Sequence, residues 1–229
     1  MKNQYSDSSG SPAPPLTLAF DTGSPLTSVV LGRGDHVLGT REAEGGRSSA
    51  RLLRLIDELL DAHDLERGAI ERVIAARGPG SFTGLRVGLA TALGLHQALG
   101  IEATAVGSLR LLARAAADAT DSRPVVALVD ALRGEWFARP FDGGGGGKAL
   151  AEATIVAPTE LLRWAPCRLT GFGLERLPAA VTGDGNIGLP PARSLAPTLL
   201  EIAGDADLDW DPAPLVEPLY LRAPAAVAG

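Results

Sequence analysis

A glycine-rich turn followed by a long apolar segment constrains the fold of this chain more than any other feature. The turn covers residues 77–80, it follows a strand-like run at 73–76, and the apolar segment extends over 81–99. Glycines allow the tight turn, and the hydroxyl of Ser81 or Thr83 can cap the helix that begins there. The sequence therefore predicts a strand, a turn and a helix of about four turns.

The predicted helix is apolar on almost every side. A helix of this kind must be covered on most of its faces. Gly84, Gly88 and Ala92 recur every four residues, so another backbone can approach one side closely. We expect one face to meet the helix's own sheet and another face to meet a second helix, of this chain or of another subunit. A bulky residue in place of Gly88 or Ala92 is expected to abolish partner binding and to leave the fold intact.

Composition excludes several classes of protein. The chain has 229 residues, enough for one large domain or two small ones, and its net charge of −6 argues against a large nucleic-acid surface of its own. A single cysteine, Cys167, excludes an internal disulfide and a cysteine cluster for zinc. Residues 1–15 lack the apolar run of a secretory signal and predict a disordered tail. The predicted helix is too short and too polar at its ends to span a bilayer. We expect a cytoplasmic protein without a membrane partner.

Hydrophobic periodicity and turn residues give a coarse map of the elements. An amphipathic helix is expected at 47–63, with Leu52, Leu55 and Leu59 on its apolar face. The other expected helices are 81–99, 108–119, 159–164 and 196–203, and the expected strands are 16–20, 26–31, 36–41, 70–76, 101–106, 125–129, 136–141, 149–156 and 168–170.

One internal repeat indicates the architecture. Asp21 and Asp130 lie about half the chain apart, and each ends a strand that opens a three-strand meander. Chance similarity of two hairpins is the alternative to a duplication. A duplicated meander-plus-helices unit predicts two similar α/β lobes that face a cleft. We expect an N-terminal lobe at 16–106, a C-terminal lobe at 107–222 and a flexible tail at 223–229.

The two glycine-containing loops allow more than one interpretation. Residues 21–24, Asp-Thr-Gly-Ser, match the aspartic-protease signature, but residues 130–132 lack the hydroxyl and the glycine that a second copy needs. Residues 78–84 fit neither a Walker A loop nor a dinucleotide fingerprint. Either these loops are tight turns that serve packing, or they are vestigial nucleotide or phosphate loops. The candidate residues for vestigial nucleotide or phosphate loops are Asp21, Thr22, Gly23, Gly78, Gly80, Ser81 and Asp130.

No set of residues in the sequence indicates catalysis. His36, His63 and His96 are scattered, and no two of them stand four residues apart as a zinc site on a helix requires. No serine lies in a Gly-x-Ser-x-Gly elbow, and Cys167 has no neighbouring histidine. We therefore predict no catalytic residue and no metal ligand.

Four motifs give a resemblance to a known family. They are LAFDT at 18–22, GPGSFTGLRVG at 78–88, DALRGE at 130–135 and PLYLR at 218–222, in this order. With them the chain resembles the TsaB (YeaZ) family, the accessory subunits of bacterial tRNA N6-threonylcarbamoyladenosine (t6A) synthesis. The resemblance covers roughly residues 16–222. It departs from the family pattern at Arg47-Ser48-Ser49, where relatives often carry a histidine, and at Leu132, where they usually carry arginine.

The resemblance implies a fold and a function. The fold is of the actin/Hsp70/sugar-kinase type, with two α/β lobes from a duplicated unit. The function is that of a non-catalytic scaffold that binds and stabilises the catalytic paralogue TsaD, together with the ATPase TsaE. This chain would need no cofactor, although ATP or ADP can bind at the complex interface. It would meet tRNA only through the complex, and alone it would form a homodimer. The alternative is a small-molecule kinase or ATPase that holds Mg-nucleotide with Asp21 and the glycine turns.

The resemblance also suggests where the partner binds. The contact between TsaB and TsaD is similar to a four-helix bundle, with two helices from each subunit. The matching segments are 47–63 and 81–99. The partner-binding residues it implies are Ser48, Arg51, Leu52, Leu55, Leu59, Thr83, Leu85, Gly88, Leu89, Ala92 and His96.

Overall fold

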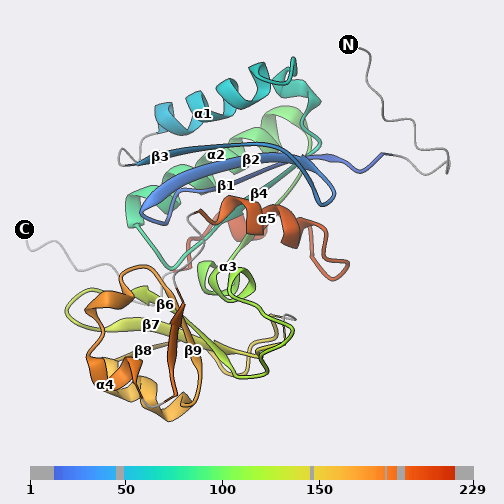
Figure 1. Ribbon diagram of the computed structural model, residues 1–229. Coiled ribbons are helices and arrows are strands. Elements are labelled where there is room, and N and C mark those ends of the chain that lie inside the picture. The colour runs from blue at the N-terminus through green and yellow to red at the C-terminus, as the bar shows by residue number, and fades with distance from the viewer. Residues whose placement is uncertain (1–12, 45–48, 145–146, 184, 190–193, 220–229) are drawn as a thin grey trace, which may run out of the picture.

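The computed structural model describes residues 13–44, 49–144, 147–183, 185–189 and 194–219. Two lobes lie one above the other, and each is built on a five-stranded sheet (Figure 1). The first sheet has the order β3-β2-β1-β4-β5 and consists of β1 (Leu16–Asp21), β2 (Leu26–Arg33), β3 (His36–Glu44), β4 (Arg72–Ala76) and β5 (Glu102–Val106). The second has the order β10-β9-β6-β7-β8 and consists of β6 (Val125–Asp130), β7 (Trp136–Phe141), β8 (Thr154–Val156), β9 (Arg168–Gly171) and β10 (Ile187–Leu189).

The two sheets repeat one topology. In the first sheet, β1, β2 and β3 form an antiparallel meander, β4 pairs parallel to β1, and β5 pairs parallel to β4. In the second, β6, β7 and β8 form the meander, β9 pairs parallel to β6, and β10 pairs parallel to β9. Asp21 and Asp130 end the first strand of each meander. The predicted duplication and the predicted actin/Hsp70/sugar-kinase type of fold are thereby confirmed.

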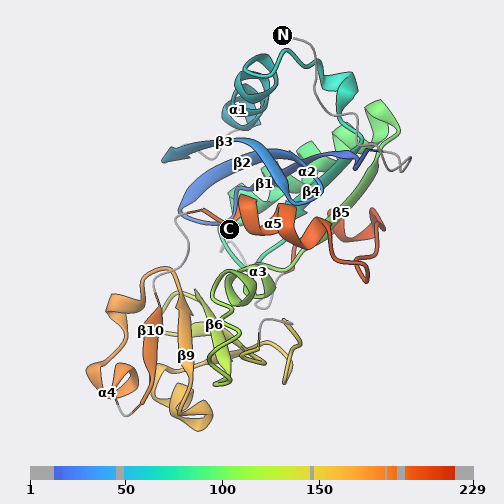
Figure 2. The same ribbon diagram turned by 45° about the vertical axis from the view of Figure 1, so that its right-hand side comes forward.

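Helices form the remaining layers. Helices α1 (Ser49–Asp61) and α2 (Phe82–Leu99) cover the outer face of the first sheet, and α4 (Ala179–Thr182) lies on the far side of the second (Figures 1 and 2). Between the sheets, α3 (Ser108–Ala115) packs on β6, and α5 (Ala196–Ala203) packs on β1 and β2. Although α5 falls in the predicted C-terminal lobe, it therefore covers the N-terminal sheet. The predicted lobe limits at 106 and 107 stay a prediction.

Three hydrophobic clusters hold these layers together. One joins α1 and α2 to the first sheet, with Leu52, Ile56 and Leu89 among its members. The middle cluster joins α3 and α5 to both sheets, and the third lies on the outer face of the second sheet around Trp136 and Cys167. Because the middle cluster contains strands of both lobes, the lobes share a core. In the described ranges, no helix is both long and apolar enough to cross a membrane.

Most predicted elements occur close to their expected bounds, and the differences have local causes. The predicted strand at 149–156 is reduced to β8, with one isolated bridge between Phe141 and Ala149. The predicted helix at 108–119 ends at Ala115, and the backbone turns at Asp118, whose carboxylate accepts a hydrogen bond from the Thr120 amide. The predicted helix at 159–164 is a 3₁₀ helix, Pro158–Trp164. The short elements α4 and β10 were not expected, because three or four residues carry too little periodicity.

Candidate functional site

The two glycine-containing loops lie against each other where the lobes meet. The amide of Ser81 donates a 2.8 Å hydrogen bond to the carbonyl of Gly23. A Cβ atom at Gly80 would lie only 2.7 Å from the same carbonyl oxygen, so this close approach requires glycine. Of the two predicted caps, Ser81 is the one in place, since its hydroxyl accepts a 3.3 Å hydrogen bond from the Gly84 amide. These contacts serve packing.

The stripe of small residues on α2 faces the chain's own loop. The hydroxyl of Thr22 donates a 2.7 Å hydrogen bond to the carbonyl of Gly84, and a Cβ atom at Gly88 would lie 2.3 Å from that hydroxyl oxygen. Ala92 is fully buried in the cluster on the outer face of the first sheet. The expectation that a bulky residue at Gly88 or Ala92 leaves the fold intact is therefore corrected: both positions are filled by this chain.

Asp21 is turned into the protein and organises its own loop. Its Oδ1 accepts hydrogen bonds from the amides of Gly23 at 2.8 Å and Ser24 at 3.3 Å, whereas Oδ2 is buried without a hydrogen-bond partner. Burial raises the pKa of Asp21 above its ordinary value of 3.8. Three of the loop amides are thus already bound, those of Gly23 and Ser24 by Asp21 and that of Ser81 by Gly23. Because these three amides are not available to a phosphate, we derive no chemistry through a nucleotide.

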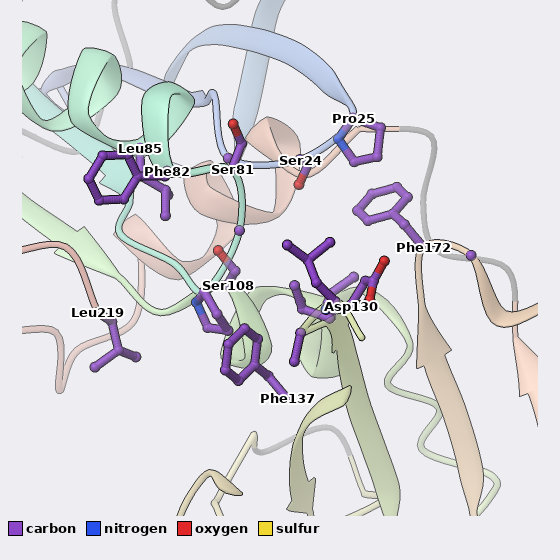
Figure 3. Close-up of a pocket in the computed structure, with 18 of the residues that line it drawn as sticks. Ser24, Pro25, Ser81, Phe82, Leu85, Ser108, Asp130, Phe137, Phe172 and Leu219 are labelled. Carbon is purple, nitrogen blue, oxygen red and sulfur yellow. Dashed lines mark hydrogen bonds between the residues drawn. The ribbon is translucent and has the colours of Figure 1, made fainter. Parts of the chain in front are cut away.

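A cleft of about 710 Å³ separates the loops from the second lobe. Figure 3 shows Ser24 and Pro25 facing Asp130 and Phe172 across it. The Oδ1 of Asp130 accepts a 2.8 Å hydrogen bond from the amide of Leu132, and its Oδ2 accepts a 2.6 Å bond from Arg176. Of the seven phosphate-loop candidates, Gly23, Gly80, Ser81 and Asp130 line the cleft, whereas Asp21, Thr22 and Gly78 lie behind its wall.

Most of the predicted partner-binding residues are buried inside the chain. These are Leu52, Leu55, Leu59, Leu85, Gly88, Leu89 and Ala92, which pack against the sheet and the loops beneath it. Arg51 and Thr83 are exposed, and His96 is half-buried with its Nδ1 2.7 Å from the carbonyl of Ile101. Ser48 lies outside the described residues. The surface that a partner can contact is therefore a different face of the same two helices.

The exposed face of α2 consists mainly of small side chains, and sequence reasoning missed it. It is formed by Phe82, Thr83, Arg86, Ala90, Gly94, Gln97 and Ala98. The guanidinium of Arg86 lies 4.0 Å from the ring centroid of Phe82, which is 42% exposed. On α1, Leu53 is 37% exposed. The signal was present as a four-residue spacing at 82, 86, 90 and 94, but alanine and glycine do not distinguish an exposed face from a buried one.

In the part of the chain that the structure describes, no three side chains of histidine, cysteine, aspartate or glutamate come together as a metal site requires. The thiol of Cys167 is buried and donates to the side-chain oxygen of Asn186 at 3.4 Å.

Comparisons with known proteins indicate the family to which the chain belongs. The model of the family described as "TsaD: tRNA N6-adenosine threonylcarbamoyltransferase" matches residues 44–170. The TsaB protein of Escherichia coli K12 is 28% identical over 220 residues, which are 90% of this chain and 94% of that protein. The TsaB protein of Haemophilus influenzae is 34% identical over 123 residues, 52% of this chain and 51% of that protein.

A solved structure gives the same result. YeaZ from Pseudomonas aeruginosa is 26% identical and superposes with a TM-score of 0.66, over 83% of this chain and 91% of that one. The TsaD family model covers more than half of the chain, and the relatives that resemble it over most of both lobes are the TsaB protein of Escherichia coli and YeaZ of Pseudomonas aeruginosa. The chain therefore belongs to the TsaB/YeaZ family.

Proposed function

We propose that this chain is a non-catalytic subunit of the machinery that forms t6A in tRNA. It acts in the cytoplasm by binding and stabilising the catalytic paralogue TsaD, and TsaE joins this complex. The names of its relatives support a role in t6A biosynthesis. The candidate site supports an accessory role, because three amides of the cleft loops, those of Gly23, Ser24 and Ser81, are hydrogen-bonded within the loops.

The observation that carries the proposal is the open face of α2. Ala90 and Gly94 are exposed at the middle of this helix, with Phe82 at its beginning. Small residues allow the backbone of another helix to approach closely, and an exposed aromatic ring supplies buried area when it does. Exposed apolar surface of this kind marks a docking face. We propose that α1 and α2 present this face to two helices of TsaD, and to a second copy of this chain when TsaD is absent.

The remaining parts of the proposal concern ligands. The chain needs no cofactor of its own, and any ATP or ADP binds at the interface with the other subunits. With a net charge of −6, the chain meets tRNA only through the complex. Partner binding favours the active state of TsaD to the extent that this chain binds that state more tightly.

The test is co-purification with TsaD of the same organism, followed by a threonylcarbamoyl-transfer assay in which each subunit is left out. Ala90→Arg places a long charged side chain on the open face of α2 and should weaken binding to TsaD at least tenfold. Ala180→Arg, at an exposed position of α4, is the matched control and should bind like the wild type. Transfer or ATP hydrolysis by this chain alone would overturn the non-catalytic role, and unchanged binding of Ala90→Arg would overturn the assignment of the face.

A further inference from the structure

We propose that the cleft between the lobes is a second docking site, for a protein segment that inserts a large apolar side chain flanked by an acidic and a basic residue. The segment belongs to the same subunit that covers α2, so the inference rests on the proposed function. It adds a contact on the second lobe, which the open face of α2 does not include.

The size and the walls of the cleft suit a side chain better than a phosphate. Its volume of about 710 Å³ lies in the range of ligand-binding clefts. Apolar residues from both lobes form most of the wall, among them Pro25, Pro79, Leu112, Phe137 and Phe172. Three of the nearby amides, those of Gly23, Ser24 and Ser81, are already bonded within the loops. An apolar side chain would remove this surface from water and needs none of these amides.

The hairpin between β6 and β7 presents two side chains at the edge of the cleft. Leu132 is 70% exposed, more than any other large hydrophobic residue among those the structure describes. Leu132 and Arg133 both have left-handed backbone conformations, with φ of 64° and 57°, and Gly134 follows with φ of 79°. A left-handed backbone conformation costs free energy at any residue other than glycine. Two such residues in succession therefore need stabilising contacts from their surroundings.

The support comes from the pair at the base of the hairpin. One carboxylate oxygen of Asp130 accepts a hydrogen bond from the Leu132 amide, and the other accepts one from the Arg176 guanidinium. The amide of Glu135 also donates to the carbonyl of Leu132 at 3.1 Å, which closes the turn. These hydrogen bonds fix the backbone of the hairpin at Leu132 before any partner arrives, and a preorganised backbone loses less entropy on binding.

Two charges in the cleft are available to a partner. Asp130 and Arg176 neutralise each other. The side chains of Arg133 and Glu175, in contrast, form no ion pair or hydrogen bond with another residue in the described part of the chain, and both line the cleft. They come from different elements, the β6–β7 hairpin and the 3₁₀ turn Leu174–Arg176. Charge complementarity therefore calls for a carboxylate near Arg133 and a cationic group near Glu175.

The cleft is continuous with the proposed face of α2. Phe82 lines the cleft and also begins the exposed row on the helix. A partner seated on α2 can therefore extend past Phe82 into the cleft and touch Leu132 on the second lobe. Such a partner would contact both lobes at once.

The experiment combines affinity with hydrogen exchange on the full chain. Binding to purified TsaD is measured for the wild type, Leu132→Asp and Arg133→Glu, with Leu150→Asp as control, because Leu150 is a second exposed leucine of the same lobe at 54% exposure and does not line the cleft. We expect each cleft variant to weaken binding at least tenfold and the control to stay within twofold. Addition of TsaD should also slow amide exchange at 130–135 and 173–176.

The outcomes separate this inference from the proposed function. Protection of α2 with unchanged exchange at 130–135 and full affinity of Leu132→Asp would overturn the cleft site and leave the proposed function standing. Weakened binding of the cleft variants together with full affinity of Ala90→Arg would support the cleft and overturn the α2 face. A wild-type chain that does not bind TsaD would overturn both.

Discussion

The hydroxyl of Thr22 donates a 2.7 Å hydrogen bond to the backbone carbonyl of Gly84, and so fastens the loop after β1 to the first turn of α2. The contact is possible because Gly88, one turn further along the helix, has no side chain. It joins the first meander to the crossover helix and sets one wall of the interlobe cleft.

The first prediction follows from this contact. Gly88→Ala would place Cβ 2.3 Å from the Thr22 hydroxyl oxygen and should lower the free energy of unfolding by about 1–3 kcal/mol, as overpacking does. Gly94→Ala, on the same helix with nothing within 4 Å, should instead stabilise the chain by roughly 0.5–1 kcal/mol. Urea unfolding of the isolated chain measures both. Equal effects of the two substitutions would contradict the packing role of Gly88.

The architecture could be predicted because its signals are local and repeated. Strands bounded by glycine and proline, and an aspartate at the same place in both halves, specify the two meanders. The parallel pair β4 and β5 follows from the helix between them, since parallel strands need a crossover. The two halves share one strand topology, although residues 130–132 do not match residues 21–24 in sequence.

The partner-binding face could not be predicted, because periodicity shows that a side chain is buried and not what buries it. Leu52 and Leu59 form a clear apolar stripe, yet the chain's own strands cover it. Gly88 could equally have faced another subunit, and only the position of Thr22 decides the matter. Exposed Ala90 and Gly94 look like core residues in the sequence. Nor does any residue near Leu132 predict its left-handed backbone.

The second prediction concerns the buried carboxyl of Asp21. Its pKa is raised by burial, so the folded chain keeps a proton there that the unfolded chain loses above about pH 3.8. This group therefore lowers stability as pH rises from 3.8 through the folded-state pKa, and the full penalty remains above it. Asp21→Asn keeps the acceptor for Gly23 and Ser24 and removes the charge. Its stability relative to the wild type should increase with pH over this window.

Urea unfolding at a series of pH values measures this difference. Asp207→Asn, which removes an exposed carboxyl, should give a curve nearly parallel to that of the wild type. A constant offset between Asp21→Asn and the wild type at every pH would show that folding does not shift the pKa of Asp21, contrary to the effect of its burial.

The third prediction concerns Arg168, a buried cation at the start of β9. Its guanidinium donates to the carbonyls of Ala116, Asp121 and Gly143, and so ties the end of α3 to two loops of the second lobe. Arg168→Met leaves these carbonyls without a donor and should cost about 3–5 kcal/mol of stability. Arg54→Met, at an exposed position of α1, should stay within about 0.5 kcal/mol of the wild type. Comparable losses at the two sites in urea unfolding would contradict this role.

The last prediction concerns the only cysteine. Burial raises the pKa of Cys167 from 9.0 to about 11, and the thiol lies beneath the second sheet against Asn186. Since the thiolate is the reactive form, a rise of this size lowers its fraction at pH 8 by roughly 100-fold, and the surrounding atoms block access as well. In the native chain, Cys167 should therefore react with a thiol reagent such as DTNB only as fast as the second lobe opens. The unfolded chain should release one equivalent of chromophore at once. Rapid reaction of the native chain, at a rate that does not change with mild urea, would show that the thiol is accessible and that this part of the core is packed differently.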